Sequence, residues 1–142
     1  MAAVSDVKYI GGASNNANFF SNEESWIKVR YEFAKDAGAL SDLNLLVNGS
    51  STKKYVITDF FAFVVVAPLS VGSAVFDLGV SAGGTELWSD KAVAALAIDT
   101  VHGKDTAAPL SLPASGVITF GIEGEVISVG TIDFYFKVKQ IL

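Results

Sequence analysis

The residue types that carry out nucleophilic catalysis are scarce in this sequence. Among its 142 residues there is no cysteine and a single histidine, His102. Nucleophilic enzymes usually set a Ser, Cys or Thr beside a base, which is most often a His. His102 lies in a Val-His-Gly-Lys segment typical of a surface loop, and the nearest carboxylates, Asp99 and Asp105, are ordinary loop acids. The sequence therefore predicts no catalytic triad and no histidine- or thiolate-based metal site.

Paired carboxylates are the other chemistry to consider, because two acids can act as general acid and base. Glu123 and Glu125 flank Gly124 in a predicted turn, while Asp77 and Asp133 stand on the polar sides of alternating segments. These positions are typical of a solvated face. The acids also lack the spacing of a calcium loop, and neither Gly-Gly pair is followed by the Lys-Ser/Thr of a phosphate loop. We therefore predict a protein that is not an enzyme, with no cofactor and no metal site.

Three aromatic side chains, Trp26, Trp88 and Tyr135, are candidates for stacking on sugar rings. Aromatic residues at such positions more often cover the edge of a core or form a subunit contact. Both interpretations stay open at the level of the sequence.

Composition restricts the partners and the compartment. The chain carries 15 acidic and 10 basic residues, a net charge of −5, and the cations are dispersed. Because nucleic acids and anionic membranes bind basic patches, neither is an expected partner. Residues 60–80 are apolar, but Pro68 and Gly72 interrupt them, so we interpret this stretch as two strands and not as a membrane span. With 51% hydrophobic and 18% charged residues, part of the apolar surface is expected to be buried against another chain.

Alternation of apolar and polar residues predicts a chain built of β-strands. It is clearest near the C-terminus, where Ile132, Phe134, Phe136 and Val138 alternate with polar partners. Further strands are predicted at residues 26–33, 43–47, 55–67, 74–80 and 118–122. A short helix is predicted at residues 89–96, with Ser89 as N-cap and several alanines. The fold class is thus all-β, a β-sandwich with a jelly-roll as one form of it, one short helix and an extended N-terminal arm.

The N-terminal residues 1–25 are predicted to be separate from a sandwich domain at residues 26–142. Residues 11–18 are small and polar, and Phe19 and Phe20 follow them. The segment is either a flexible leader or an arm that becomes ordered on a neighbouring subunit, with Phe19 and Phe20 as anchors.

The middle of the longest predicted strand is apolar on both faces. Residues 60–67 contain Phe61, Phe63 and Val65 on one side and further apolar residues on the other. In a strand with one solvent-exposed face, apolar and polar residues would alternate. We therefore expect the second face of this strand to be covered by another subunit or by a folded-over arm. Phe61, Phe63 and Val65, together with Trp26, Phe19 and Phe20, are the predicted contacts with other copies or with a capsid.

The predicted strands and turns also resemble a group of small virion proteins of tailed phages. The resemblance is carried by KVRYEFA at 28–34, VITDF at 56–60, GSAVFDLGVS at 72–81, AVAAL at 92–96 and GTIDFYF at 130–136. It spans roughly residues 26–140 and is a pattern of strands and turns without a chemical motif.

This resemblance implies a capsid decoration, or cement, protein. Such proteins look like β-rich trimers on the outer surface of a capsid, so the implied partners are further copies of the chain and the major capsid protein. The implied location is the virion, after synthesis in the bacterial cytoplasm. The alternative is a head-fibre or tail module that binds a receptor or carbohydrate through Trp26, Trp88 or Tyr135.

Overall fold

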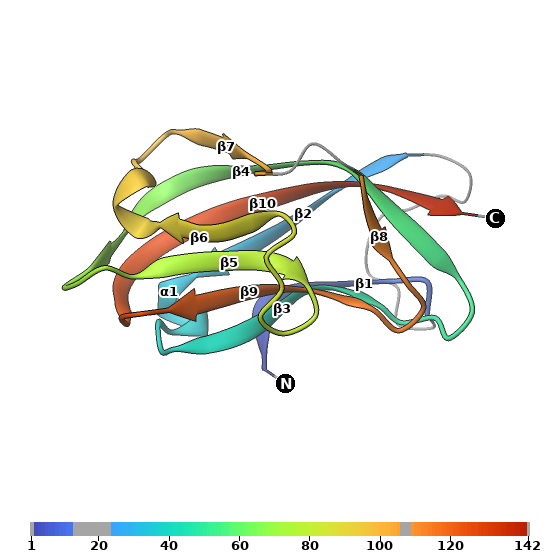
Figure 1. The fold of residues 1–142 in the computed structure, drawn as a ribbon, viewed down its shortest axis with the longest axis horizontal. Coiled ribbons are helices and arrows are strands. Elements are labelled where there is room, and N and C mark those ends of the chain that lie inside the picture. Colours follow the sequence, from blue (N-terminus) through green and yellow to red (C-terminus); the bar gives the residue numbers. More distant parts are fainter. Residues whose placement is uncertain (1, 13–23, 106–108, 142) are drawn as a thin grey trace.

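The computed structural model describes residues 2–12, 24–105 and 109–141, almost all of which belong to strands or their short connections (Figure 1). The strands are β1 (Ala3–Ile10), β2 (Ser25–Glu32), β3 (Ser41–Asn48), β4 (Lys54–Ser70), β5 (Val75–Val80), β6 (Trp88–Ala92), β7 (Val101–Gly103), β8 (Leu110–Leu112), β9 (Val117–Glu123) and β10 (Ile127–Ile141). One helical turn, α1 (Phe33–Asp36), follows β2, and a 3-10 turn, η1 (Val93–Ala95), follows β6.

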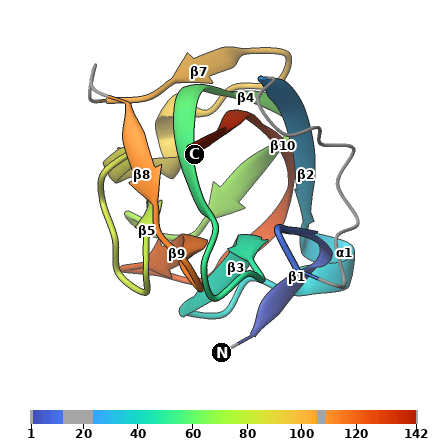
Figure 2. The ribbon, with the colours of Figure 1, turned by 90° about the vertical axis from the view of Figure 1, so that its right-hand side faces the viewer.

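Two sheets face each other, as the end-on view shows (Figure 2). One has the order β1-β3-β9-β5-β6, and the other has the order β2-β10-β4-β7 with β8 also paired to β4. Between β2 and β10 the antiparallel pairs are nested, since β2 pairs with β10, β3 with β9, β4 with β7 and β5 with β6. This nesting is the strand order of a jelly roll, so the predicted β-sandwich is confirmed in that form.

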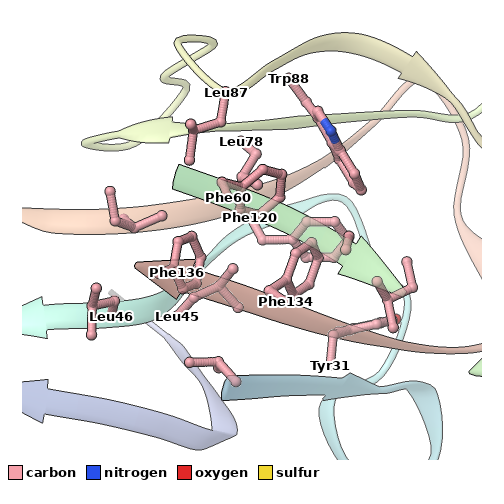
Figure 3. Close-up of a cluster of buried hydrophobic side chains, with 14 of the residues drawn as sticks. Tyr31, Leu45, Leu46, Phe60, Leu78, Leu87, Trp88, Phe120, Phe134 and Phe136 are labelled. Carbon is pink, nitrogen blue, oxygen red and sulfur yellow. The ribbon is translucent and has the colours of Figure 1, made fainter. Parts of the chain in front are cut away.

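Aromatic side chains fill the space between the sheets (Figure 3). Phe134 lies at the centre, with ring centroids 5.2 Å from Phe120 and 5.7 Å from Trp88. Phe60 of β4 contacts Trp88 of β6 and Phe136 of the neighbouring strand β10. The inward phenylalanines come from β4, β9 and β10, and Phe134 and Phe136 are two positions apart on β10, as the period of two predicts.

The described part of the predicted arm is built into the sandwich. β1 pairs in parallel with β3, and its Val4 and Ile10 are buried in the common core. Phe19 and Phe20 lie outside the described residues, so their role as anchors stays a prediction, as does the domain boundary at residue 25.

The helix predicted at residues 89–96 is wrong. Residues 88–92 form β6, whose Lys91 and Ala92 pair with Phe76 and Val75 of β5, and only residues 93–95 turn as a 3-10 helix. Pairing with an existing sheet outweighs the weak helical preference of a few alanines. Val93 and Leu96 do face the core as predicted. None of the helices found in the described residues is long and apolar enough to cross a membrane.

Candidate functional site

The outer face of the β2-β10-β4-β7 sheet carries a cluster of aromatic side chains. Trp26 on β2 and Tyr135 on β10 both contact Phe61 on β4, the first edge-on at 5.3 Å between ring centroids and the second stacked at 4.6 Å. Strand pairing creates this contact, since Tyr135 lies directly opposite Phe61 and Lys137 directly opposite Trp26. Trp26 keeps 45% of its surface exposed. A large aromatic surface is therefore held in a fixed geometry and left open to solvent.

Apolar residues continue from this cluster along β4. Phe63 and Val65 are half-buried, and Val101 of β7 is exposed opposite Phe63. Val65 lies at a bulge, because its neighbours Val64 and Val66 pair with consecutive residues of β10. We call Trp26, Phe61, Phe63, Val65, Val101 and Tyr135 the outer apolar face.

Four of the predicted contact residues, Trp26, Phe61, Phe63 and Val65, belong to the outer apolar face, and their contact with another chain stays a prediction. The inner residues of β4, Phe60, Ala62 and Val64, are buried in the core, whereas Phe61, Phe63 and Val65 are half-buried. The structure brings Trp26 and Phe61 into contact, and it places Phe63 and Val65 further along the same face. The sequence did not show that Tyr135 and Val101 would join them, because this depends on which strands are neighbours.

A charged cluster borders the outer apolar face. Arg30 binds both carboxylate oxygens of Asp133, at 2.7 Å from Nε and 3.0 Å from Nη2, and Lys28 Nζ lies 3.6 Å from the same carboxylate. The hydrogen bond with Asp133 raises the pKa of Arg30. The side chain of Asp133 is only 5% exposed, so the interpretation of this residue as solvated surface charge is wrong.

The free edge of β2 is closed by two carboxylates. Asp6 accepts a hydrogen bond from the Arg30 backbone N–H at 2.8 Å, and Asp36 accepts those of Glu32 and Ser5 at 2.9 and 2.6 Å. Burial alone would raise the pKa of Asp6, but hydrogen bonds from Lys8 and from the Arg30 backbone lower it. An unpaired edge invites a strand from another chain, and here the Arg30 and Glu32 donors are already used. This part of the β2 edge is therefore protected against pairing with a further strand.

A polar hollow beside this edge is not an obvious anion site. It is lined by Asp6, Lys28, Arg30, Glu32 and Lys35. Its cations already lie close to acids, since Lys28 and Arg30 contact Asp133 and Lys35 Nζ lies 3.8 Å from Glu32. An incoming anion would have to displace these carboxylates.

Trp88 is not available for ligand binding. It is fully buried, its Nε1–H donates to the Gly103 carbonyl at 2.9 Å, and its ring packs against Phe60 and Phe134. The interpretation of Trp88 as a sugar-stacking residue is therefore wrong. Its hydrogen bond joins β6 and β7, which belong to different sheets, and local sequence does not reveal this contact.

Three acids converge on the outer face of the other sheet. Asp77, Asp90 and Glu123 have carboxylate oxygens within 4.8 Å of one another, a separation that could hold a cation. Asp77 is 4% exposed, contrary to its interpretation as a solvated acid, and accepts the Asp90 backbone N–H at 2.7 Å. A hydrogen bond with Asp77 and the negative charge of Asp77 raise the pKa of Glu123.

His102 is half-buried on β7, where its Nε2 lies 2.8 Å from the Thr100 hydroxyl. Burial, with a smaller contribution from Lys91, lowers the pKa of His102. The ring is thus neutral at physiological pH and paired with a hydroxyl of its own strand region.

The fold has counterparts among solved structures. No protein-family model matches the chain, and no curated protein matches it. A chain in the capsid of Ralstonia phage GP4 matches 94% of this chain over 99% of its own length, with a TM-score of 0.60 and 12% identity. A chain in the acid-stable capsid of Helicobacter pylori bacteriophage KHP30 matches 87% of this chain over 96% of its own length, with a TM-score of 0.51 and 13% identity. At these identities the similarity is one of fold, and it extends over nearly the whole of each chain.

Proposed function

We propose that this protein is a structural component of a phage virion that binds the outer surface of the capsid and stabilises it as a homo-oligomer, a trimer. The observation that carries the proposal is the jelly-roll similarity to chains of two phage capsids along nearly the full length of each chain. This role requires no catalytic group, cofactor or metal ion. The partners are further copies of the chain and the major capsid protein.

The outer apolar face is the proposed contact between copies. Interfaces are enriched in aromatic residues, and exposed Trp and Tyr side chains often contribute most of the binding energy. Trp26 and Tyr135 hold fixed positions against Phe61, so covering them costs little side-chain entropy. Phe63 and Val65 would lose their remaining exposed surface in the same contact.

The charges around this face do not oppose the approach of a second copy. Lys137 Nζ lies 3.1 Å from Glu24, and Lys28 and Arg30 both contact Asp133. Because these neighbouring charges are locally balanced, the apolar area can be buried without confronting like charges.

The first test is the copy number of the chain in purified virions, measured by quantitative mass spectrometry. We expect a number comparable to that of the capsid subunit, bound on the outer surface. A chain that is absent from virions, or present in only a few copies, contradicts the decoration role.

The second test addresses the oligomer. Light scattering after size exclusion should give a trimer for the wild type at micromolar concentration and a monomer for Phe63→Glu. Val71→Glu is the matched control, since Val71 is exposed in the β4–β5 turn away from this face. A monomeric wild type, or a trimeric Phe63→Glu, contradicts the proposed contact.

A second candidate function is carbohydrate binding by a head-fibre or tail module. It is favoured by the exposed Trp26 beside Tyr135, with Lys137 Nζ 5.9 Å from the indole centroid. Glycan-array binding that is lost on Trp26→Ala supports this function. An array without any signal contradicts it.

A further inference from the structure

One end of the sandwich presents exposed apolar side chains from four different connections. In a jelly roll, the β2–β3, β4–β5, β6–β7 and β9–β10 connections meet at the same end, here the left end of Figure 1. Each contributes one large exposed residue, namely Leu40 (56%), Val71 (93%), Ile98 (57%) and Val126 (50%), and Leu69 (58%) precedes the β4–β5 turn. We call these five residues the apolar end.

In the described chain, the opposite end of the sandwich has mostly small or polar exposed residues. The exposed residues of its β3–β4 and β5–β6 connections are Gly, Ser, Thr, Lys and other small or polar residues, and Leu87 in the second connection is buried. Among the described residues, Ile141 is exposed toward that end, as is Trp26 at the start of β2. Singly exposed apolar residues are ordinary, but here each of the four connections at one end carries one.

The loops of the apolar end hold one another in place. The Ile127 backbone N–H donates to the Gly38 carbonyl at 3.0 Å, and Asp99 donates to the Val64 carbonyl at 2.8 Å. Gly72 packs directly under the Glu125 side chain, where a Cβ would come within 2.6 Å of Glu125 Cγ. A surface that is already ordered loses little entropy when a partner covers it.

The charge beside the apolar end is negative. Glu123 and Glu125 lie at the β9–β10 turn, and Asp99 lies in the loop that carries Ile98. Asp77 and Asp90 continue this acidic region from Glu123 onto the outer face of the sheet. Lys35, in the β2–β3 connection, lies 3.8 Å from Glu32, which balances its charge.

We propose that the apolar end is the docking surface for a protein other than a copy of this chain, one that presents an apolar hollow flanked by Lys or Arg. Charge complementarity favours this occupant, because a copy that met this surface with its own apolar end would bring acids against acids and an anionic bilayer would also be repelled. The inference rests on the proposed function, in which the occupant is the capsid shell. Copies then join through the outer apolar face, and each copy contacts the shell through its apolar end.

The test uses the full chain and capsid particles from a deletion mutant of the phage that lacks this protein. Binding is measured by co-sedimentation over a range of protein concentrations. Val71→Glu should weaken binding at least tenfold while the protein remains a trimer. Ile141→Glu, at the opposite end and 48% exposed, is the matched control and should change binding less than twofold.

A charge variant tests the nature of the partner. Glu125→Lys should weaken binding, and added salt should weaken binding of the wild type. Three results would overturn the proposed docking role of the apolar end but leave the proposed function intact. They are unchanged binding of Val71→Glu, tighter binding of Glu125→Lys, and binding that does not respond to salt. Loss of the trimer in Val71→Glu also overturns this docking role, because the end would then be a contact between copies. A wild-type protein that does not bind the particles overturns both the proposed function and the docking role of the apolar end.

Discussion

Removing either partner of the Arg30–Asp133 ion pair should have unequal effects on stability. The side chain of Asp133 is 5% exposed, whereas that of Arg30 is 37% exposed. Arg30→Met leaves a buried carboxylate with only Lys28, 3.6 Å away, as its nearest cation. Asp133→Leu leaves a guanidinium that can reach water. The first substitution should therefore be the more harmful.

The magnitudes follow from the burial of each partner. Breaking a fully buried pair costs about 3–5 kcal/mol. Because Arg30 is more than a third exposed and Lys28 remains, we expect about 2–3 kcal/mol for Arg30→Met and about 1 kcal/mol for Asp133→Leu. The double variant should cost no more than about 1 kcal/mol, since two apolar side chains of similar size then replace the pair.

The assay is urea unfolding followed by circular dichroism, at one fixed protomer concentration because association also contributes to stability. The four proteins of the cycle give the coupling energy between the two sites. Equal costs for the two single variants, or a double variant whose cost is their sum, would refute the reasoning.

Three further predictions concern the core, the acidic cluster and a loop. Trp88→Phe should lower the free energy of unfolding by about 2–3 kcal/mol, because the Gly103 carbonyl loses its donor and a cavity forms; an unchanged urea midpoint would contradict this. Glu123 has a raised pKa, so the native state binds more protons than the unfolded state above pH 4.5, and stability falls as pH rises through that window. Glu123→Gln should remove this fall in thermal midpoints measured across pH 4–8, and an identical pH profile for both proteins would argue against it. Gly38→Ala forces a Cβ onto the Ile127 carbonyl and should lower the free energy of unfolding by about 1–3 kcal/mol. Gly103→Ala is the control, because a Cβ there meets nothing within 4 Å. Equal urea midpoints for the two variants would rule out this clash.

In the alternating segments, the local sequence pattern correctly predicted which side chains face the core. Ile132, Phe134 and Phe136 were predicted to face a core and are fully buried between the sheets. The prediction succeeds because side-chain direction in a strand depends only on position along the strand. The two-sided apolar stretch in β4 was equally informative, since its inner residues are buried and Phe61 and Phe63 remain only half-covered in the described chain.

Predictions failed where the answer depended on neighbours distant in sequence. Residues 89–92 were predicted to be helical, but they lie in β6, which pairs with the edge of β5. Asp133 appeared solvated on its own strand, but Arg30, 103 positions away, covers it. The convergence of Asp77 with Glu123 requires β5 and β9 to be adjacent, which no spacing along the chain encodes.

By itself, the sequence determined that this is an all-β protein and that the middle of its longest strand is apolar on both faces. These properties follow from residue types and a period of two, which are local. The tertiary structure alone decided the jelly-roll order, the burial of Trp88, the cluster around Phe61 and the meeting of four apolar loops at one end. Each of these depends on which strands become neighbours, and that is fixed by the packing of the whole chain.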